Sequence, residues 1–144
     1  MWSKTYSKTV RGIKIEEIWH VWSDINQWHV WQDDIEYAKL NGKFEAGNKF
    51  TLKPKNVSAV TIRLVKVETN KCFIDLTCFP LAKMYGEHEF ISLGDDELEI
   101  KTTIRVTGLL SFVWRKLVAE KIAADEAMQT EQLIKRVVAL RVAT

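Results

Sequence analysis

Apolar and polar residues alternate from about residue 34 to residue 107, in short runs separated by turn signals such as Asn41-Gly42. Alternation with a period of two is typical of strands that have one buried and one solvated face. Short turns between consecutive strands favour an antiparallel meander. We expect a first strand over residues 2–10 and later strands over residues 35–40, 50–52, 58–67, 72–78, 83–91 and 97–107.

Helical spacing replaces the alternation in two places. After the first strand, residues 15–22 repeat apolar residues at helical intervals, and a second short helix would contain Ile25, Trp28 and Trp31. From about residue 110 to residue 142 there is no glycine or proline, and helix formers dominate. This last segment predicts one helix of about 45–50 Å.

The sequence offers no second long helix to pack against the last one, so its apolar face must lie on the concave side of the sheet. We therefore expect an α+β fold over residues 1–144, in which a curved antiparallel sheet of six to seven strands wraps around the C-terminal helix. A strongly twisted sheet is wider than one helix, so a void should remain beside the helix. Either a ligand or large side chains fill this void, and the sequence leaves both alternatives open.

Residues 15–31 resemble the START-like superfamily, also called SRPBCC or helix-grip proteins, and in particular its polyketide cyclase/dehydrase and lipid-transport type. The resemblance rests on Glu17-Ile18-Trp19, on Ser23-Asp24-Ile25, and on two tryptophans three residues apart, Trp28 and Trp31. It extends through Gly47, through Glu87-His88-Glu89-Phe90 and through Gly108-Leu109-Leu110. His29 and Lys14-Ile15 depart from the family pattern. The resemblance implies the helix-grip fold, which hosts lipid and sterol carriers, quinone-binding proteins, aromatase/cyclases and chaperone-binding modules.

The candidate ligand-binding residues are those that the alternation and the helical spacing direct toward the void. In residues 72–78 and 83–91 we expect the even-numbered residues on the inner face, although a slip of one residue would reverse the face. His88 and Tyr37 are the candidate catalytic or polar anchoring groups. The full set is Trp31, Tyr37, Phe50, Leu52, Ile62, Leu76, Met84, His88, Phe90, Ile104, Trp114, Leu117 and Met128.

Composition and motifs exclude several classes of function. A net charge of +2 is too small for a nucleic-acid footprint. No apolar run approaches the ~20 residues of a membrane span, so we expect a cytoplasmic protein without stable membrane insertion. The histidines and cysteines form no metal motif and no phosphate loop is present, so we expect neither a metal nor an organic cofactor. Cys72 and Cys78 are expected to be reduced core residues.

Three functions remain. The first is a non-catalytic binder of a hydrophobic small molecule such as a lipid, an isoprenoid, a quinone or a polyketide. The second is a cyclase or dehydratase in which His88 and Tyr37 orient and protonate the substrate. The third is a protein-interaction module that uses the sheet's outer face or the basic side of the last helix to bind a protein partner.

Overall fold

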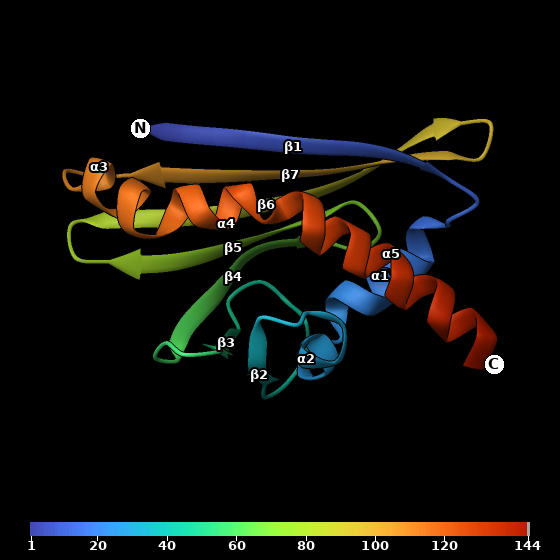
Figure 1. Cartoon of the computed structure of the whole chain (residues 1–144), viewed down its shortest axis with the longest axis horizontal. Coiled ribbons are helices and arrows are strands. Elements are labelled where there is room, and N and C mark those ends of the chain that lie inside the picture. Colours follow the sequence, from blue (N-terminus) through green and yellow to red (C-terminus); the bar gives the residue numbers. More distant parts are fainter. Residues whose placement is uncertain (144) are drawn as a thin grey trace.

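The computed structural model describes residues 1–143 as a seven-stranded antiparallel sheet with helices on one side (Figure 1). The strand order is β1-β7-β6-β5-β4-β3-β2, so β2 to β7 form a meander and β1 is added beside β7. This confirms the expected α+β architecture. The strands are β1 (Trp2–Arg11), β2 (Ile35–Leu40), β3 (Lys49–Pro54), β4 (Val60–Glu68), β5 (Cys72–Phe79), β6 (Ala82–Gly94) and β7 (Glu97–Thr107). Thr144, at the end of the expected domain, lies outside the described residues.

Two groups of helices complete the fold. The first group is α1 (Ile15–Ser23), the 3-10 turn η1 (Ile25–Gln27) and α2 (Trp28–Trp31), where the tryptophan spacing predicts helices. The C-terminal segment is α3 (Ser111–Trp114), the π-helical turn η2 (Arg115–Ala119), α4 (Glu120–Ala124) and α5 (Glu126–Ala143). The expected single helix is therefore widened at η2 and interrupted at Asp125.

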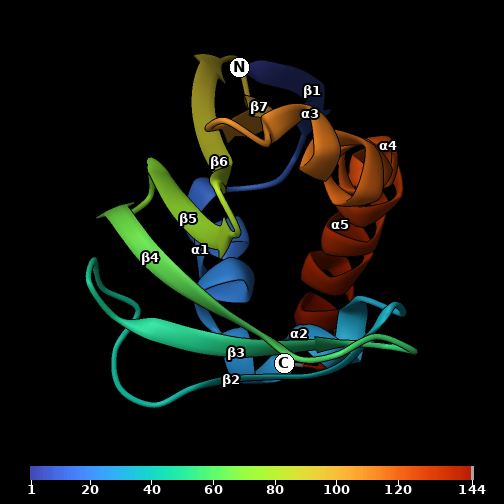
Figure 2. The ribbon, with the colours of Figure 1, turned by 90° about the vertical axis from the view of Figure 1, so that its left-hand side faces the viewer.

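The sheet curls, and the C-terminal helices lie along its open side (Figure 2). Helices α1 and α2 contact α5 and lie at one end of the curl. Between them and the sheet is a core that contains Trp22, Phe50, Phe73 and Leu133. A smaller core lies under η2 and α4, where Ala119 and Ala123 let the helix approach Val106 and Ile104 closely. The C-terminal helical segment therefore packs against the sheet in two cores, and a space remains between these cores.

Strand β5 faces the opposite way from our expectation. Residues directly opposite each other in an antiparallel pair share a face, and β5 pairs Phe73 with His88 and Asp75 with Gly86. Because Gly86 and His88 are on the buried face of β6, as predicted, the odd-numbered residues of β5 point inward. Leu76 therefore faces outward, and Cys78 is exposed rather than buried in the core. Apolar residues occur at both even-numbered and odd-numbered positions of β5, so the alternation could not define its buried face.

The inner face of the C-terminal helix also differs from our expectation. Its buried positions are spaced alternately by four and three residues: Ala119, Ala123, Glu126, Thr130, Leu133 and Val137. Leu117 and Met128, which we expected to face the void, are 68% and 51% exposed. The buried stripe includes a carboxyl and a hydroxyl group, so hydrophobicity does not mark it. The π-helical turn further shifts the helical phase before residue 120.

Candidate functional site

A cavity of about 120 Å³ lies inside the curl, between the sheet and the helical segments. Its apolar wall includes Trp22, Trp28, Phe50, Ile104 and Ile122. Its polar wall is unusual for the centre of a small domain, because it contains three ionisable side chains. The polar lining side chains are Gln32, Asp75, Thr77, His88, Glu126 and Gln129.

Asp75 and His88 form a pair across β5 and β6. The His88 Nε2 atom lies 3.3 Å from Asp75 Oδ2, and both side chains are largely buried. Gly86, which is opposite Asp75, makes this arrangement possible: a Cβ atom at residue 86 would lie 2.8 Å from Asp75 Oδ1. A glycine at this position therefore leaves the space that the Asp75 carboxylate occupies.

Aromatic contacts hold the His88 ring in place. Phe73 stacks on it with a centroid distance of 4.3 Å, and the Trp22 ring lies 4.9 Å away. A carboxylate accepts hydrogen bonds and does not donate them, so the contact with Asp75 selects the tautomer with the proton on Nε2, in which Nδ1 is an acceptor. His88 therefore offers one fixed, unpartnered nitrogen at the wall of the cavity.

Glu126 faces the cavity from the first turn of α5 and is only 4% exposed. Burial raises the pKa of its carboxyl group to about 7, while the nearby His88 opposes this rise and Asp75 adds to it. Near neutral pH the group therefore exists in both protonation states, so it can donate or accept a proton. Beside it, Gln129 Nε2 donates to Gln32 Oε1 at 3.0 Å and links α5 to the end of α2.

Several buried polar atoms have no hydrogen-bond partner within the described residues. They are Trp22 Nε1, Trp31 Nε1, Gln32 Nε2, His88 Nδ1 and Glu126 Oε2. Four of these five atoms belong to residues that line the cavity. More than nine-tenths of buried polar groups in folded proteins are satisfied. The unpaired groups around this one space could hydrogen-bond to water or to a polar group of a ligand.

The structure brings together about half of the residues that sequence reasoning selected. Phe50, Leu52, Ile62, Met84, His88 and Ile104 line the cavity. Trp31 and Phe90 are buried in the core but do not line it. Trp114 is far along the helix, where it stacks on Phe79 at 4.4 Å. Leu76, Leu117 and Met128 lie outside the cavity lining.

Tyr37, which we expected to face the void, lies at the surface instead. The residue is 43% exposed, and it is absent from the cavity wall. The register of β2 against β3 shifts between Ile35 and Tyr37, which indicates a β-bulge. An extra residue in one strand reverses the alternation beyond it, so Ala38 and Leu40 are buried instead.

Sequence reasoning missed most of the polar wall. Asp75 and Glu126 look like ordinary surface residues because acidic side chains are rarely buried. One signal was available for Asp75: it is a charged residue in the middle of an otherwise apolar strand. For Trp22 and Trp28, which were recognised as parts of short helices, the missing information was the packing of those helices against the sheet.

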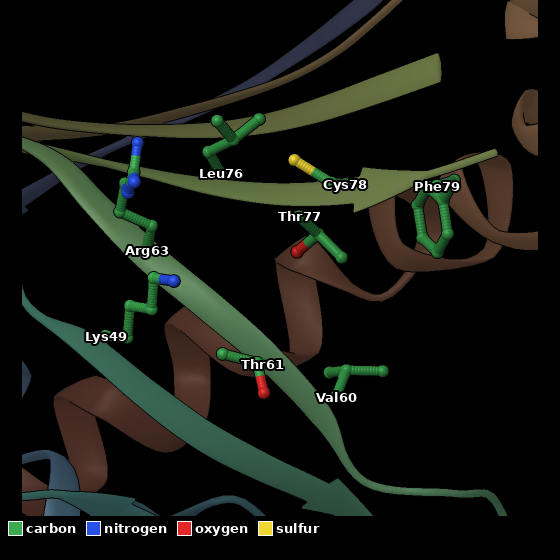
Figure 3. A pocket seen from close by; sticks show the side chains of 8 residues that line it. All are labelled: Lys49, Val60, Thr61, Arg63, Leu76, Thr77, Cys78 and Phe79. Carbon is green, nitrogen blue, oxygen red and sulfur yellow. The ribbon is translucent and has the colours of Figure 1, made fainter. Parts of the chain in front are cut away.

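A second, open groove of about 530 Å³ lies at the gap where β4 and β5 separate (Figure 3). The two strands pair only from Arg63 and Leu76 onward, so Val60 and Phe79 lie apart at the wide end. Lys49 and Arg63 lie at the narrow end (Figure 3). Thr77 lines both this groove and the inner cavity. The two spaces are therefore adjacent at Thr77.

Two further findings limit what the described part of the chain contains. Within residues 1–143, no three or more His, Cys, Asp or Glu side chains are grouped so that they could hold a metal ion. No helix in the same range is both long enough and apolar enough to span a membrane.

No protein-family model matches the chain, and no curated protein matches its sequence. Solved structures do match over nearly the whole chain. A hypothetical protein from Helicobacter pylori superposes with a TM-score of 0.76 at 11% identity, covering 94% of this chain and 88% of that one. Norcoclaurine synthase from Thalictrum flavum, solved with dopamine and hydroxybenzaldehyde, gives 0.70 at 12% identity, covering 96% and 87%. A START superfamily protein from Mycobacterium smegmatis gives 0.67 at 17%, covering 94% and 98%.

These similarities establish the fold, which is the START-like (SRPBCC) helix-grip fold that residues 15–31 indicate.

Proposed function

We propose that the inner cavity binds a small molecule with an apolar body and one polar group, and that Glu126, His88 and Gln32 hold the polar group. The observation that carries this proposal is the set of orphaned polar atoms around a single cavity. A ligand hydroxyl or carbonyl group would satisfy the Gln32 amide and the Glu126 carboxyl, and a hydroxyl could also donate to His88 Nδ1. Trp22, Trp28 and Phe50 would contact the apolar body.

The size of the cavity favours a ligand of about one ring. An apolar cavity of about 150 Å³ holds a benzene molecule, and this cavity measures about 120 Å³. Pockets for larger ligands usually measure about 300–1,000 Å³. A lipid, isoprenoid, quinone or polyketide would therefore require the sheet and the C-terminal helix to move apart.

The charge of the lining favours a neutral or cationic ligand. Asp75 and Glu126 are the acidic lining residues, and no lysine or arginine lines the cavity. An anionic ligand would face like charge in a poorly solvated space, which costs several times more than in water. A hydroxyl or ammonium group would instead find acceptors at Glu126 and His88.

Three probes with the same ring test this proposal: benzyl alcohol, benzylamine and benzoate. Binding is measured from amide NMR shifts and from the fluorescence of Trp22 and Trp28, which line the cavity. We expect the first two probes to bind and to shift the amides of Gly86, His88 and Glu126, and we expect benzoate not to bind. Native mass spectrometry of the freshly purified protein would identify a co-purifying natural ligand directly.

A cavity-filling variant supplies the control. Ile104→Phe adds a ring inside the cavity, and Ile91→Phe adds the same volume at a residue that is 39% exposed. Ile104→Phe should weaken binding at least tenfold, while Ile91→Phe should leave it unchanged. Equal binding by both variants, or tighter binding of benzoate than of benzylamine, contradicts the proposal.

A second candidate function is acid–base catalysis in the same cavity. It is favoured by the raised pKa of Glu126 and by the Asp75–His88 pair, which together place a proton donor and an oriented acceptor at one small space. The structure removes Tyr37 from this role, because its side chain is at the surface.

Catalysis is tested with a ketone of one ring, by measuring exchange of the α-protons of cyclohexanone in heavy water. The wild-type protein should accelerate exchange over His88→Asn and Glu126→Gln, two variants of nearly unchanged shape. If the probes bind but exchange proceeds at the same rate in all three proteins, the chain is a binder and not an enzyme of this type.

A further inference from the structure

Large apolar side chains are concentrated at the surface of one end of the molecule. Among the described residues, six large apolar side chains are between 63% and 84% exposed. Five of them, Met1, Leu81, Leu109, Phe112 and Leu117, lie at the end where the chain begins, where β5 turns into β6 and where β7 leads into α3 (Figure 1). The sixth is Val142, near the other end of the chain. We call these five residues the apolar tip.

Leu81 is exposed and also has an unfavourable backbone conformation. It occupies the turn between β5 and β6 with a φ of 55°, in the left-handed region that disfavours most L-residues. The preceding residue is Pro80, and a turn of this kind usually places glycine or asparagine after the proline. A leucine here is unfavourable both for the backbone and for solvation, so stability does not explain its presence.

The three segments of the tip are joined into one surface. The Leu110 amide donates to the Leu81 carbonyl at 3.0 Å, which ties the β7–α3 connection to the β5–β6 turn. The Trp114 indole donates to the Pro80 carbonyl at 3.0 Å. Trp2 pairs with Val106 and lies 5.3 Å from the Arg115 guanidinium. The exposed leucines and Phe112 therefore belong to one surface whose segments are held together by hydrogen bonds. Trp2 and Trp114 lie beside this surface.

The charge around the tip is mainly positive. Residues 1–4, 79–83 and 107–117 contain Lys4, Lys83, Arg115 and Lys116 and no aspartate or glutamate. Glu120, just beyond these segments, pairs with Arg115 at 2.8 Å and with Lys116 at 3.5 Å. The tip region thus has a net charge of +3 when Glu120 is included, whereas the whole chain has only +2.

We propose that the apolar tip docks this protein reversibly on an anionic membrane surface. Leucine and phenylalanine side chains would enter the interface between head groups and acyl chains, and lysine and arginine would contact the anionic head groups. Trp2 and Trp114 would lie at the head-group level, where tryptophan is enriched. Docking of this kind does not require a membrane-spanning helix and is independent of what the inner cavity binds.

Flotation with vesicles tests the proposal. Wild-type protein should float with phosphatidylcholine vesicles that contain a quarter phosphatidylglycerol, and much less with phosphatidylcholine alone. Raising the salt concentration from about 0.1 M to 1 M shortens the Debye length from about 10 to 3 Å and should weaken the binding. The double variant Leu81→Asn, Phe112→Ser should lose at least tenfold in partitioning, because two apolar side chains no longer enter the interface.

Leu93→Asn is the matched control. Leu93 is a 52% exposed leucine near the β6–β7 turn, which lies at the opposite end of the sheet from the β5–β6 turn (Figure 1). It should not change vesicle binding. Circular dichroism and urea unfolding of each variant verify that the fold is retained.

Three results would overturn the proposal. The first is a wild-type protein that does not float with the anionic vesicles. The second is an equal loss of flotation in Leu93→Asn and in the tip variant. The third is a self-association of the wild-type protein, seen by sedimentation, that the tip variant abolishes without any vesicle binding; the tip would then be a protein–protein contact.

Discussion

The inner cavity and the apolar tip depart from the usual distribution of residues in opposite directions. The cavity buries Asp75, His88 and Glu126 inside the domain, and the tip exposes Leu81 and Phe112 to solvent. Each arrangement lowers stability, because a buried ionisable group loses hydration and an exposed apolar group orders water. The remainder of the core follows the ordinary rule, with Ile18, Leu64 and Leu133 fully buried.

The two regions also differ in how they are supported. The cavity side chains are held by neighbouring side chains, as Phe73 and Asp75 hold His88. The tip is held by its backbone, through the carbonyl of Leu81 and the close approach of Gly108. Cavity function should therefore be sensitive to changes of side-chain chemistry, and the tip should be sensitive to changes of backbone conformation.

The largest effect is expected for Gly108→Ala. Gly108 has a φ of 108°, and a Cβ atom there would lie 2.5 Å from the Leu81 carbonyl oxygen. Backbone strain and the clash together should lower the free energy of unfolding by about 4 kcal/mol, measured by urea denaturation. Gly47→Ala is the control, because Gly47 has a φ of 95° but nothing within 4 Å of the added Cβ. An equal loss of stability in the two variants would mean that Gly108 is not in close contact with the Leu81 carbonyl.

The next effect concerns the pH dependence of Glu126→Gln. The folded-state pKa of Glu126 is raised from 4.5 to about 7. The folded protein therefore binds this proton more tightly than the unfolded chain, so the contribution of Glu126 to stability falls as pH rises from 4.5 to 7 and is constant above that range. Its ionisation should cost about 3 kcal/mol at pH 8 relative to pH 4.

Urea unfolding of the wild type and of Glu126→Gln at pH 4, 6 and 8 measures this cost. Other carboxyl groups titrate in both proteins, so the difference between the two curves isolates Glu126. The variant should gain stability over the wild type as pH rises. Parallel curves would show that Glu126 is hydrated and is not the buried acid that the cavity geometry requires.

A smaller effect, a rise in the free energy of unfolding, is expected at the tip. Leu81→Asn replaces a left-handed leucine with a residue that tolerates this conformation, and it should raise the free energy of unfolding by about 1 kcal/mol. A stabilising substitution that weakens vesicle binding would show that stability is given up for function at this position. Leu93→Asn should not stabilise, because Leu93 is not among the residues with positive φ. A destabilised Leu81→Asn would contradict the strain argument.

The smallest effect is expected for Arg141→Gln, which lies away from both regions. Arg141 donates to both carboxylate oxygens of Glu17 at 2.6 Å and so ties α5 to α1. These hydrogen bonds lower the pKa of Glu17 to about 2, so the stabilisation is present above pH 4.5 and is lost as pH falls toward 2. The substitution should cost a small amount of stability at pH 7, as expected for a partly exposed ion pair, and much less at pH 2, where about half of the Glu17 carboxyl groups are protonated in the folded protein.

The same urea titrations measure this difference. Because the Glu17 carboxyl group is stabilised by its partner and Glu126 is destabilised by burial, their pH profiles should slope in opposite directions. A cost of Arg141→Gln that is undiminished at pH 2 would show that the arginine acts through packing or through its hydrogen bond to the Gly12 carbonyl, and not through its pairing with Glu17.

The sequence predicts the fold well because alternation and turn signals are local properties. The expected strands over residues 35–40 and 97–107 match β2 and β7 to the residue, and the α+β arrangement follows from the single long helical segment. The resemblance carried by residues 15–31 agrees with the fold of the solved structures. These features do not depend on which side chains meet in space.

The faces of individual elements were harder to predict because they depend on single residues. One bulge at Ile35/Tyr37 puts Tyr37 outside, and the mixed apolar pattern of β5 conceals an inward Asp75. On the C-terminal helix, Glu126 and Thr130 occupy buried positions that hydrophobicity assigns to the surface. The polar wall of the cavity therefore had almost no signal in the sequence, since a functional buried acid looks like a solvated one.

The position of β1 has a consequence for the synthesis of the chain. Residues 2–11 pair with residues 97–106, so β1 leaves the ribosome well before its partner β7 is made. At about 5–20 residues per second, this delay lasts roughly ten seconds. Throughout that time Trp2, Tyr6 and Val10 belong to a nascent strand without its partner, which is the kind of segment that chaperones protect. The sheet can therefore be completed only after β7 has been translated, when β1 pairs with it.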